Sequence, residues 1–184
     1  MATDTDIFFN DTWKLFFHDP SDSDWTMESY VALGVISNTD DFWAATNTIA
    51  PHIASGMFFL MREHVFPCWD DTYNIDGGCY SVRVPRANAR DAMIDMMIAT
   101  LGETLLSEEH RSKWDMINGI SISPKNAFNV IKIWMGKGDP VNYEHLWLPA
   151  SRTKDVLYTK FRDQISGSSN RKAPRPLYPR HGSN

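Results

Sequence analysis

Three tryptophans and one aspartate are the residues of this chain whose types could bind a flat, cationic ligand. Trp25, Trp69 and Trp134 lie in three separate segments, and Asp70 directly follows Trp69. An indole face attracts a cation more strongly than other aromatic rings do, and a carboxylate accepts two parallel N–H bonds from one planar edge. A methylated guanine base has both features. The alternative is that these tryptophans fill a core, and residue types alone leave both interpretations open.

Motifs for catalysis and for phosphate or metal binding are not found in the sequence. The chain has no phosphate-cradling GxxxxGKS or GxxxxGKT loop, no GxSxG, no HExxH and no paired CxxC. Its six histidines are scattered, and none has a recognisable triad or metal-ligand spacing. We therefore predict a protein that is not an enzyme and has no catalytic residues, no metal and no cofactor. An active site assembled from distant segments is the alternative.

Length and composition fit one well-buried domain with tails. The chain has 184 residues, of which 42% are hydrophobic and 22% are charged. Its two cysteines fit no zinc or redox motif and are expected to be free thiols in a reducing compartment. The small, acidic N-terminus is unlike a signal peptide, and no apolar run approaches the roughly 20 residues that span a bilayer. We expect a protein of the cytoplasm, with the nucleus as an alternative, and no membrane partner.

Charge is distributed unevenly along the chain. There are 18 basic and 23 acidic residues, and an acidic body argues against broad duplex binding, which needs many phosphate contacts. Residues 171–180 nevertheless hold four basic residues and no acidic one, including Arg171, Lys172 and Arg175. Because this stretch is rich in proline, we expect it to be extended. It is either a solvated terminus or an arm that contacts phosphates.

Local patterns predict the elements that must position the tryptophans. Aromatic or alternating runs predict strands at residues 13–18, 30–36, 57–61, 79–84, 117–123, 128–135 and 155–159. Apolar spacing predicts helices at about 39–50 and 89–103, with short helices at 107–114 and 139–147. Thr39 is expected to cap the first helix. The mixed order and hairpin-length links favour an α+β fold with an antiparallel sheet and helices on one face.

The helix expected at 89–103 has more apolar surface than one sheet can cover. Its core face consists of Ala89, Ala92, Met93, Met96, Met97 and Thr100. Ile94, Ile98 and Leu105 form a second arc, roughly 100–140° from the first. This arc is either buried by a neighbouring element or left for a partner. Trp43 also lies off the core stripe of its helix, which predicts partial exposure.

Taken in order, seven segments resemble the cap-binding translation initiation factor 4E family. They are Trp13–Phe17, Trp25, Asp41–Ala44, Pro67–Asp70, Gly77-Gly78, Leu101–Glu103 and Ile131–Trp134, at near-family spacing over about residues 12–160. The resemblance implies a curved antiparallel sheet with helices on its convex face and the messenger RNA cap on its concave side. It implies a single cap-binding domain at 12–165, between a flexible N-terminus, 1–11, and an Arg/Pro-rich flexible tail, 166–184.

The resemblance also implies roles for individual residues. Trp25 and Trp69 are similar to the pair that sandwiches 7-methylguanine, and Asp70 to the carboxylate that reads the base edge. Trp134 is similar to the residue that touches the N7 methyl group. Lys125 matches a basic position that contacts the cap phosphates. These roles agree with the side-chain chemistry, since stacking contributes about 1–3 kcal/mol per base.

Several positions depart from the family's pattern. The family usually has Glu at Asp70 and Arg at Lys125, while Val130 and Cys79 stand where basic residues are expected. The triphosphate site therefore has fewer basic side chains than the family's pattern, and Lys125 lacks the fork geometry of arginine. Lys132 and the basic residues of the tail are candidate substitutes. Strand alternation puts Lys132 on the same side as Val130, and its reach depends on the tertiary structure.

A second surface is implied on the convex side. Trp43 is similar to the tryptophan that family members offer to scaffold proteins and repressors, and Thr39, Ile94 and Ile98 match the same surface. The implied partner is a short amphipathic helix of a 4G-type scaffold or of a 4E-binding repressor. The implied function is recruitment of capped messenger RNA to translation initiation. A cap-binding repressor or storage factor, and a cap-modifying enzyme, are the alternatives.

Overall fold

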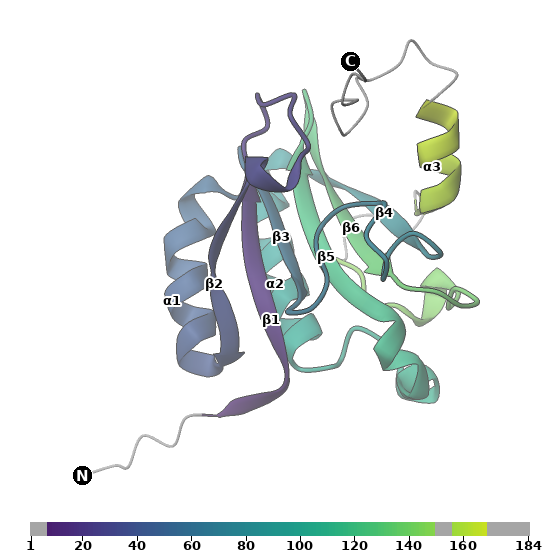
Figure 1. Ribbon diagram of the computed structural model, residues 1–184. Coiled ribbons are helices and arrows are strands. Elements are labelled where there is room, and N and C mark those ends of the chain that lie inside the picture. Colours follow the sequence, from purple (N-terminus) through teal and green to yellow (C-terminus); the bar gives the residue numbers. More distant parts are fainter. Residues whose placement is uncertain (1–6, 150–155, 169–184) are drawn as a thin grey trace, which may run out of the picture.

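A seven-stranded sheet forms the frame of the protein (Figure 1). The computed structural model describes residues 7–149 and 156–168. The strands are β1 (Phe8–His18), β2 (Tyr30–Asn38), β3 (Met57–Arg62), β4 (Gly78–Pro85), β5 (Ile117–Pro124), β6 (Phe128–Met135) and β7 (Leu157–Lys160). Their order is β2-β1-β3-β5-β6-β4-β7, and every neighbouring pair is antiparallel. The predicted fold class, α+β with a curved antiparallel sheet, is confirmed.

Two helices cover one face of this sheet, and a third lies by the other face. The helices are α1 (Thr39–Ile49), α2 (Ala89–Leu101) and α3 (Phe161–Ser168). In the part of the chain that is described, five 3-10 helices lie between the other elements: η1 (Met27–Ser29), η2 (Ala50–His52), η3 (Arg86–Asn88), η4 (Glu108–Met116) and η5 (Tyr143–His145). The predicted core face of α2 is buried along its whole length. None of the helices in the described residues is long and apolar enough to cross a membrane.

Alternation along the strands gives the sheet two different faces. In β3, Phe58 and Leu60 belong to the large core beneath α1 and α2, whereas Phe59 and Met61 belong to a smaller cluster on the opposite face. We call this smaller group the aromatic cluster; its buried members are Phe16, Phe59, Met61, Val65, Cys79, Trp134 and Phe161. Trp69 packs against it. Trp69 and Trp134 therefore lie on the face away from α1 and α2.

One predicted helix is wrong and one observed helix was not predicted. Over residues 139–147 the chain forms only the three-residue 3-10 helix η5, Tyr143–His145. Pro140 restricts the preceding residue to extended backbone, and Asn142 caps this short helix by accepting a bond at Oδ1 from Glu144 N at 3.2 Å. The unpredicted helix is α3, whose first residue, Phe161, is fully buried.

Three predicted boundaries also differ from the structure. Asn38 caps α1, because its Oδ1 accepts a hydrogen bond from Asp41 N at 2.8 Å; the prediction that Thr39 is the cap was wrong by one position. β1 begins at Phe8 and α3 runs to Ser168. Residues 8–11 and 166–168 therefore lie in regular elements and not in the flexible tails that were predicted.

Candidate functional site

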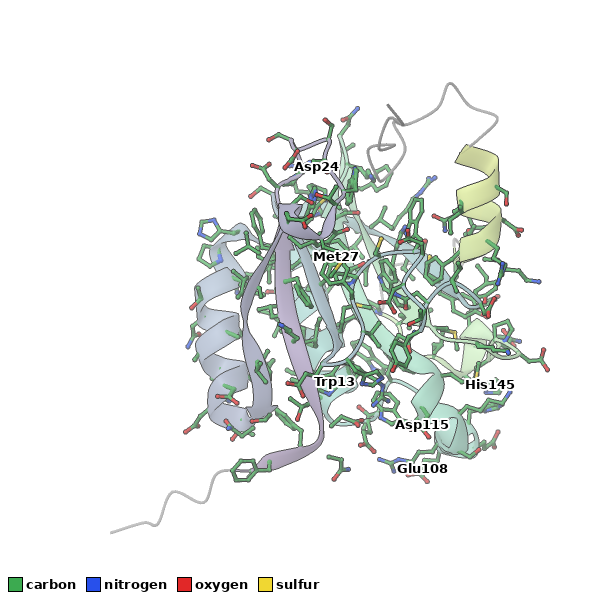
Figure 2. All side chains as sticks on the ribbon, in the orientation of Figure 1. Trp13, Asp24, Met27, Glu108, Asp115 and His145 are labelled. Carbon is green, nitrogen blue, oxygen red and sulfur yellow. The ribbon has the colours of Figure 1, made fainter. Side chains whose placement is uncertain are left out.

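Trp25 lies in the loop that joins β1 to β2, at one end of the sheet, next to the Asp24 labelled in Figure 2. Its ring stacks on the imidazole of His18, with ring centroids 4.1 Å apart and an interplanar angle of 6°. His18 is fully buried, and its Nε2 lies 2.7 Å from the carbonyl oxygen of Asp24. The stack covers one face of Trp25, and the 38% exposure of Trp25 leaves ring surface for a ligand.

Trp69 lies in the loop that joins β3 to β4, and buried amides hold this loop in place. Asn74 is fully buried, and its Nδ2 donates to the carbonyl oxygens of Phe66 at 2.9 Å and Cys68 at 2.8 Å. Asn118 of β5 donates from Nδ2 to Asn74 Oδ1 at 2.8 Å. Because these bonds lie on both sides of Trp69 in sequence, the loop is tied to the sheet before any ligand arrives.

Tyr30, at the start of β2, links the two loops. Its ring centroid lies 6.3 Å from that of Trp25 and 5.0 Å from that of Phe66. Its hydroxyl donates to the carbonyl oxygen of Pro67 at 3.1 Å. Burial raises the pKa of Tyr30, so the phenol stays protonated and remains a donor. The structure thus brings the Trp25 and Trp69 segments together around one phenol.

Asp70 already has a hydrogen-bond donor in this structure. Cys68 Sγ donates to Asp70 Oδ1 at 2.6 Å. Burial raises the pKa of the Cys68 thiol to about 12, so the sulfur carries its proton at neutral pH. A thiol is a weak donor. Two N–H groups of a ligand could therefore displace Cys68 from the carboxylate.

Lys132 is the basic side chain that the fold brings to Trp69. Its Nζ lies 5.5 Å from the centroid of the Trp69 ring. Lys132 and Trp134 are two positions apart in β6, and residues at this spacing point to the same side of a strand. Both therefore lie on the face of the aromatic cluster. The ammonium group thus occupies the type of position that a cationic ligand takes over an indole.

Trp134 is not open to a ligand in this structure, contrary to the sequence prediction. It is 2% exposed, and its Nε1 donates to Ser121 Oγ at 2.9 Å. Its ring lies against Phe161, with centroids 5.0 Å apart. Phe161 begins α3, the helix that local patterns did not reveal. Trp134 is therefore a buried member of the aromatic cluster.

Lys125, another predicted phosphate contact, lies in a different loop from Trp25 and from Trp69. Lys125 lies in the exposed turn between β5 and β6, where its carbonyl oxygen accepts from Arg86 Nη2 at 2.5 Å. Among the described residues, no hydrogen bond or ion pair joins Lys125 to the Trp25 or Trp69 loops. Three further predicted contacts lie outside the described residues: Arg171, Lys172 and Arg175.

On the helix-covered side, one apolar residue of each helix is open to solvent. Trp43 of α1 is 53% exposed and Ile98 of α2 is 47% exposed. The predicted second arc is divided, because α2 ends at Leu101, Leu105 beyond it is fully buried, and Ile94 packs partly against the large core. Thr39 is half-buried in the first turn of α1. Trp43 and Ile98 are the exposed large apolar side chains of α1 and α2.

His18 and Tyr30 are the contributors to the site that sequence reasoning missed. Both were placed in predicted strands, but neither was assigned a role. His18 shares the sheet face of Phe16 by alternation, and its opposite partner across β1 and β2 is Tyr30. That pairing depends on strand register, which the sequence alone did not specify.

The chain is similar to known proteins along most of its length. The family model described as eukaryotic initiation factor 4E matches residues 8–174. Eukaryotic translation initiation factor 4E of Candida glabrata is 27% identical over 166 residues, which cover 85% of this chain and 74% of that protein. Eukaryotic translation initiation factor 4E-2 of Arabidopsis thaliana is 22% identical over 136 residues, 70% of this chain and 54% of that protein. The chain therefore spans about half the length of the Arabidopsis relative.

A solved structure has the same fold. It is described as the complex of C. elegans eIF4E-3 with the 4E-binding protein Mextli and a cap analog, and it superposes with a TM-score of 0.71 at 21% identity. The match covers 88% of this chain and 96% of that chain. At this level of identity the likeness establishes the fold alone.

Proposed function

This chain belongs to the eukaryotic initiation factor 4E family, and from that premise we propose that it binds the 7-methylguanosine cap of messenger RNA. The methylated base carries a positive charge, and the indoles of Trp25 and Trp69 would stack on its two faces. Asp70 would accept two N–H bonds from the edge of the base. Binding requires no bond-making step, so the function is recognition and not catalysis.

The observation that carries this proposal is the link through Tyr30. Two loops, each with a partly exposed tryptophan, are tied to one phenol on the face away from α1 and α2. Tryptophans that serve only the core would be buried, as Trp13 and Trp114 are. The carboxylate of Asp70 lies next to Trp69 in the same anchored loop, where it can read a base stacked on the indole.

Two weak contacts of the protein would give way when the cap binds. The ammonium of Lys132 would leave the face of Trp69, at a cost of about 0.5–1 kcal/mol for an exposed cation–π contact. The thiol of Cys68 would release Asp70 Oδ1. The gains are larger, at about 1–3 kcal/mol per stacked base and about 1.5–3 kcal/mol for hydrogen bonds to a charged group. Lys132 would then be available to the cap phosphates.

The remaining phosphate contacts are proposed from charge. Lys125 and Lys132 would contact the triphosphate, and Arg171, Lys172 and Arg175 would supply the charge that Val130 and Cys79 do not. Deletion of residues 171–184 should then lower the affinity for capped RNA and reduce its salt dependence. Unchanged affinity after the deletion would refute the role of the tail.

Cap recognition can be tested by tryptophan fluorescence titration with 7-methyl-GTP, using GTP as the control ligand. We expect strong quenching by the methylated nucleotide only, because the N7 positive charge strengthens stacking on indole. Trp25→Leu and Trp69→Leu should each abolish the response. Trp147→Phe is the matched control, since Trp147 is exposed and belongs to neither loop. Equal quenching by both nucleotides, or none by either, would overturn the proposal.

On the opposite face, we infer that an amphipathic helix of a 4G-type scaffold or of a 4E-binding repressor docks on Trp43 and Ile98, with Thr39 and Ile94 at its edges. The exposure of these two apolar side chains supports this surface. Trp43→Ala should abolish co-purification of the partner, whereas Trp147→Ala should not. A scaffold that brings a helicase would support a role in initiation, and a repressor alone would support storage. Either role places the protein in the cytoplasm, with the nucleus as an alternative.

A cap-modifying enzyme is the alternative that needs a separate experiment. Labelled cap analogue would be incubated with the protein, with and without Mg²⁺ or a methyl donor. An unchanged label supports a binding protein, and released or methylated nucleotide would contradict it.

A further inference from the structure

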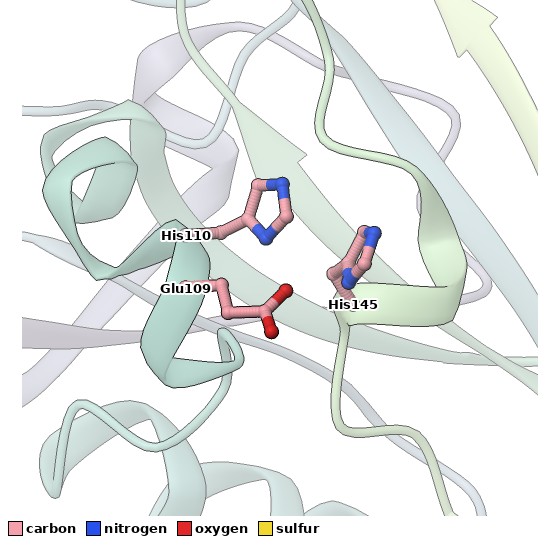
Figure 3. A group of neighbouring side chains, drawn as sticks. All are labelled: Glu109, His110 and His145. Atoms are coloured by element: carbon pink, nitrogen blue, oxygen red, sulfur yellow. The ribbon is translucent and has the colours of Figure 1, made fainter.

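We propose that Glu109, His110 and His145 form a binding site for a divalent transition metal, with Zn²⁺ as the ion it fits best (Figure 3). One carboxylate oxygen and one ring nitrogen of each histidine all lie within 4.8 Å of one another. Two imidazoles and one carboxylate are a donor set that binds Zn²⁺ and leaves a fourth position for water. This site goes beyond the proposed cap binding and shares no residue with it.

The backbone brings the two histidine segments together. Leu106 and Leu146 form an isolated antiparallel bridge. Next to it, Ser107 N donates to the carbonyl oxygen of His145 at 2.8 Å. His110 follows in the first turn of η4, so its position relative to His145 is set by main-chain pairing and not by side-chain rotation alone. Local sequence patterns could not predict this site, because its ligands come from two distant segments.

The two imidazole rings lie side by side, and a modest rearrangement would let them share an ion. The centroids of His110 and His145 are 4.0 Å apart, with an interplanar angle of 28°. Ser107 Oγ lies 3.3 Å from His110 Nδ1, and a hydroxyl can donate or accept there, so either tautomer of the imidazole is available. In a tetrahedral site with bonds of about 2.0–2.2 Å, ligand atoms lie about 3.3 Å apart. The group must therefore contract, and one stacked ring must rotate.

The side chains have the freedom to make that change. Glu109 is exposed and both histidines are half-buried, so rotation about side-chain torsions does not disturb the core. With neutral imidazoles the group carries one negative charge, which favours a divalent cation. Two nitrogen donors favour Zn²⁺ over Mg²⁺ and Ca²⁺, which prefer oxygen ligands.

The site is remote from the Trp25 loop. In Figure 2, Glu108 and His145 lie at one end of the molecule, and Asp24 and Met27, which flank Trp25, lie at the other. A bound ion would crosslink η4 to η5 without touching the cap. It would stabilise the folded chain by mass action, because the unfolded chain does not hold the three ligands together.

The test is isothermal titration of the full chain with ZnCl₂, after removal of any affinity tag and of bound metal by a chelator. We expect one ion per chain with micromolar affinity, and no heat with MgCl₂. His110→Asn and His145→Asn should each weaken Zn²⁺ binding by more than about tenfold, since even loss of an outer-shell partner costs that much. His52→Asn is the matched control, because His52 is an exposed histidine outside the cluster.

The melting temperature provides a second measurement of Zn²⁺ binding. Zn²⁺ should raise the melting temperature of the wild type and not that of Glu109→Gln, a substitution at an exposed residue that leaves the histidine stack in place. The proposal is overturned if the wild type binds no Zn²⁺ at micromolar concentration, or if the His110→Asn/His145→Asn double variant binds it equally well. Binding of 7-methyl-GTP should be the same in all of these variants, which separates this result from the test of cap recognition.

Discussion

The protein contains two pairs of tryptophans with a nearby carboxylate, and its own chain fills one of them. In the filled pair, the buried guanidinium of Arg62 lies 5.1 Å from the ring centroid of Trp13 and 5.5 Å from that of Trp114. Asp11 Oδ2 accepts from Arg62 Nη1 at 2.7 Å and from Trp114 Nε1 at 3.0 Å. Arg62 Nε also donates to the carbonyl oxygen of Ile117 at 2.7 Å. Cation, indoles and carboxylate are all satisfied internally.

The open pair has weaker occupants in the same places. Trp25 is stacked on His18, Trp69 is approached by the ammonium of Lys132, and Asp70 receives one thiol hydrogen. These contacts leave both tryptophans partly exposed. Two indole faces with a carboxylate therefore act as a structural element where the chain supplies a buried guanidinium. The same groups become a ligand site where the chain supplies only partial, displaceable contacts.

Removing the cation of the filled pair should have the largest effect on stability. Arg62→Met leaves Asp11 without its partner and takes a packed guanidinium away from two indoles. We expect the free energy of unfolding to fall by about 3–5 kcal/mol, measured by urea denaturation. Arg83→Met is the matched control, since Arg83 lies 5.1 Å from the Phe128 ring but is exposed; it should lose about 0.5–1 kcal/mol. Equal losses in the two variants would remove the basis of the comparison.

Truncating one tryptophan of each pair should separate binding from folding. Trp69→Ala should lower the affinity for 7-methyl-GTP about 5- to 150-fold, because a stacked base contributes about 1–3 kcal/mol. Trp114→Ala should instead lower the free energy of unfolding by about 3–5 kcal/mol and leave the affinity of the folded fraction unchanged. Fluorescence titration and urea denaturation of both variants would measure this. A Trp69 variant that unfolds but binds normally would contradict the distinction.

Asp70, the carboxylate of the open pair, should contribute to ligand binding, and Asp71 of the same loop should not. Asp70→Asn should weaken 7-methyl-GTP binding about tenfold, because hydrogen bonds to a charged group contribute about 1.5–3 kcal/mol. Asp70→Glu should tighten binding, because the longer side chain reaches past Cys68. Asp71→Asn is the control: its carboxylate accepts from Tyr73 N at 2.9 Å within the same loop. If titration calorimetry finds equal affinities for all three variants, Asp70 does not read the base.

The smallest effect concerns the thiol that holds Asp70. Burial raises the pKa of Cys68 from 9.0 to about 12. Between these values the unfolded chain has already released the proton that the folded chain keeps, so stability is intact below pH 9.0 and falls as pH rises toward about 12. Cys68→Ala should reduce this slope in urea denaturation.

The second free cysteine provides the comparison for this prediction. Burial also raises the pKa of Cys79, so Cys79→Ala should change the slope too. Only Cys68→Ala should tighten 7-methyl-GTP binding, because only Cys68 competes for Asp70. An unchanged slope and unchanged affinity in Cys68→Ala would show that the thiol neither stays protonated nor restrains the carboxylate.

Local periodicity explains why much of the fold could be predicted. The alternation over the first six residues of β6 and the apolar stripe of α2 follow from backbone geometry within one element, and their buried faces match the prediction. β5 differs, because its first six residues are all buried and both of its faces are covered. Residues 139–147 were predicted as one helix, but Pro140 keeps the preceding residue extended, and the helix that Asn142 caps, Tyr143–His145, is a single 3-10 turn. The helix α3 was missed because its eight residues contain only one apolar pair at helical spacing, Phe161 and Ile165.

By itself, the sequence determined the fold class, the faces of the strands and the candidacy of Trp25, Trp69 and Asp70, because residue type and period are local properties. Tertiary structure decided which candidates are reachable. It buried Trp134 beneath Phe161 and brought Lys132 to Trp69. Such contacts join residues distant in the chain, and their existence depends on strand register and packing, which no local pattern encodes.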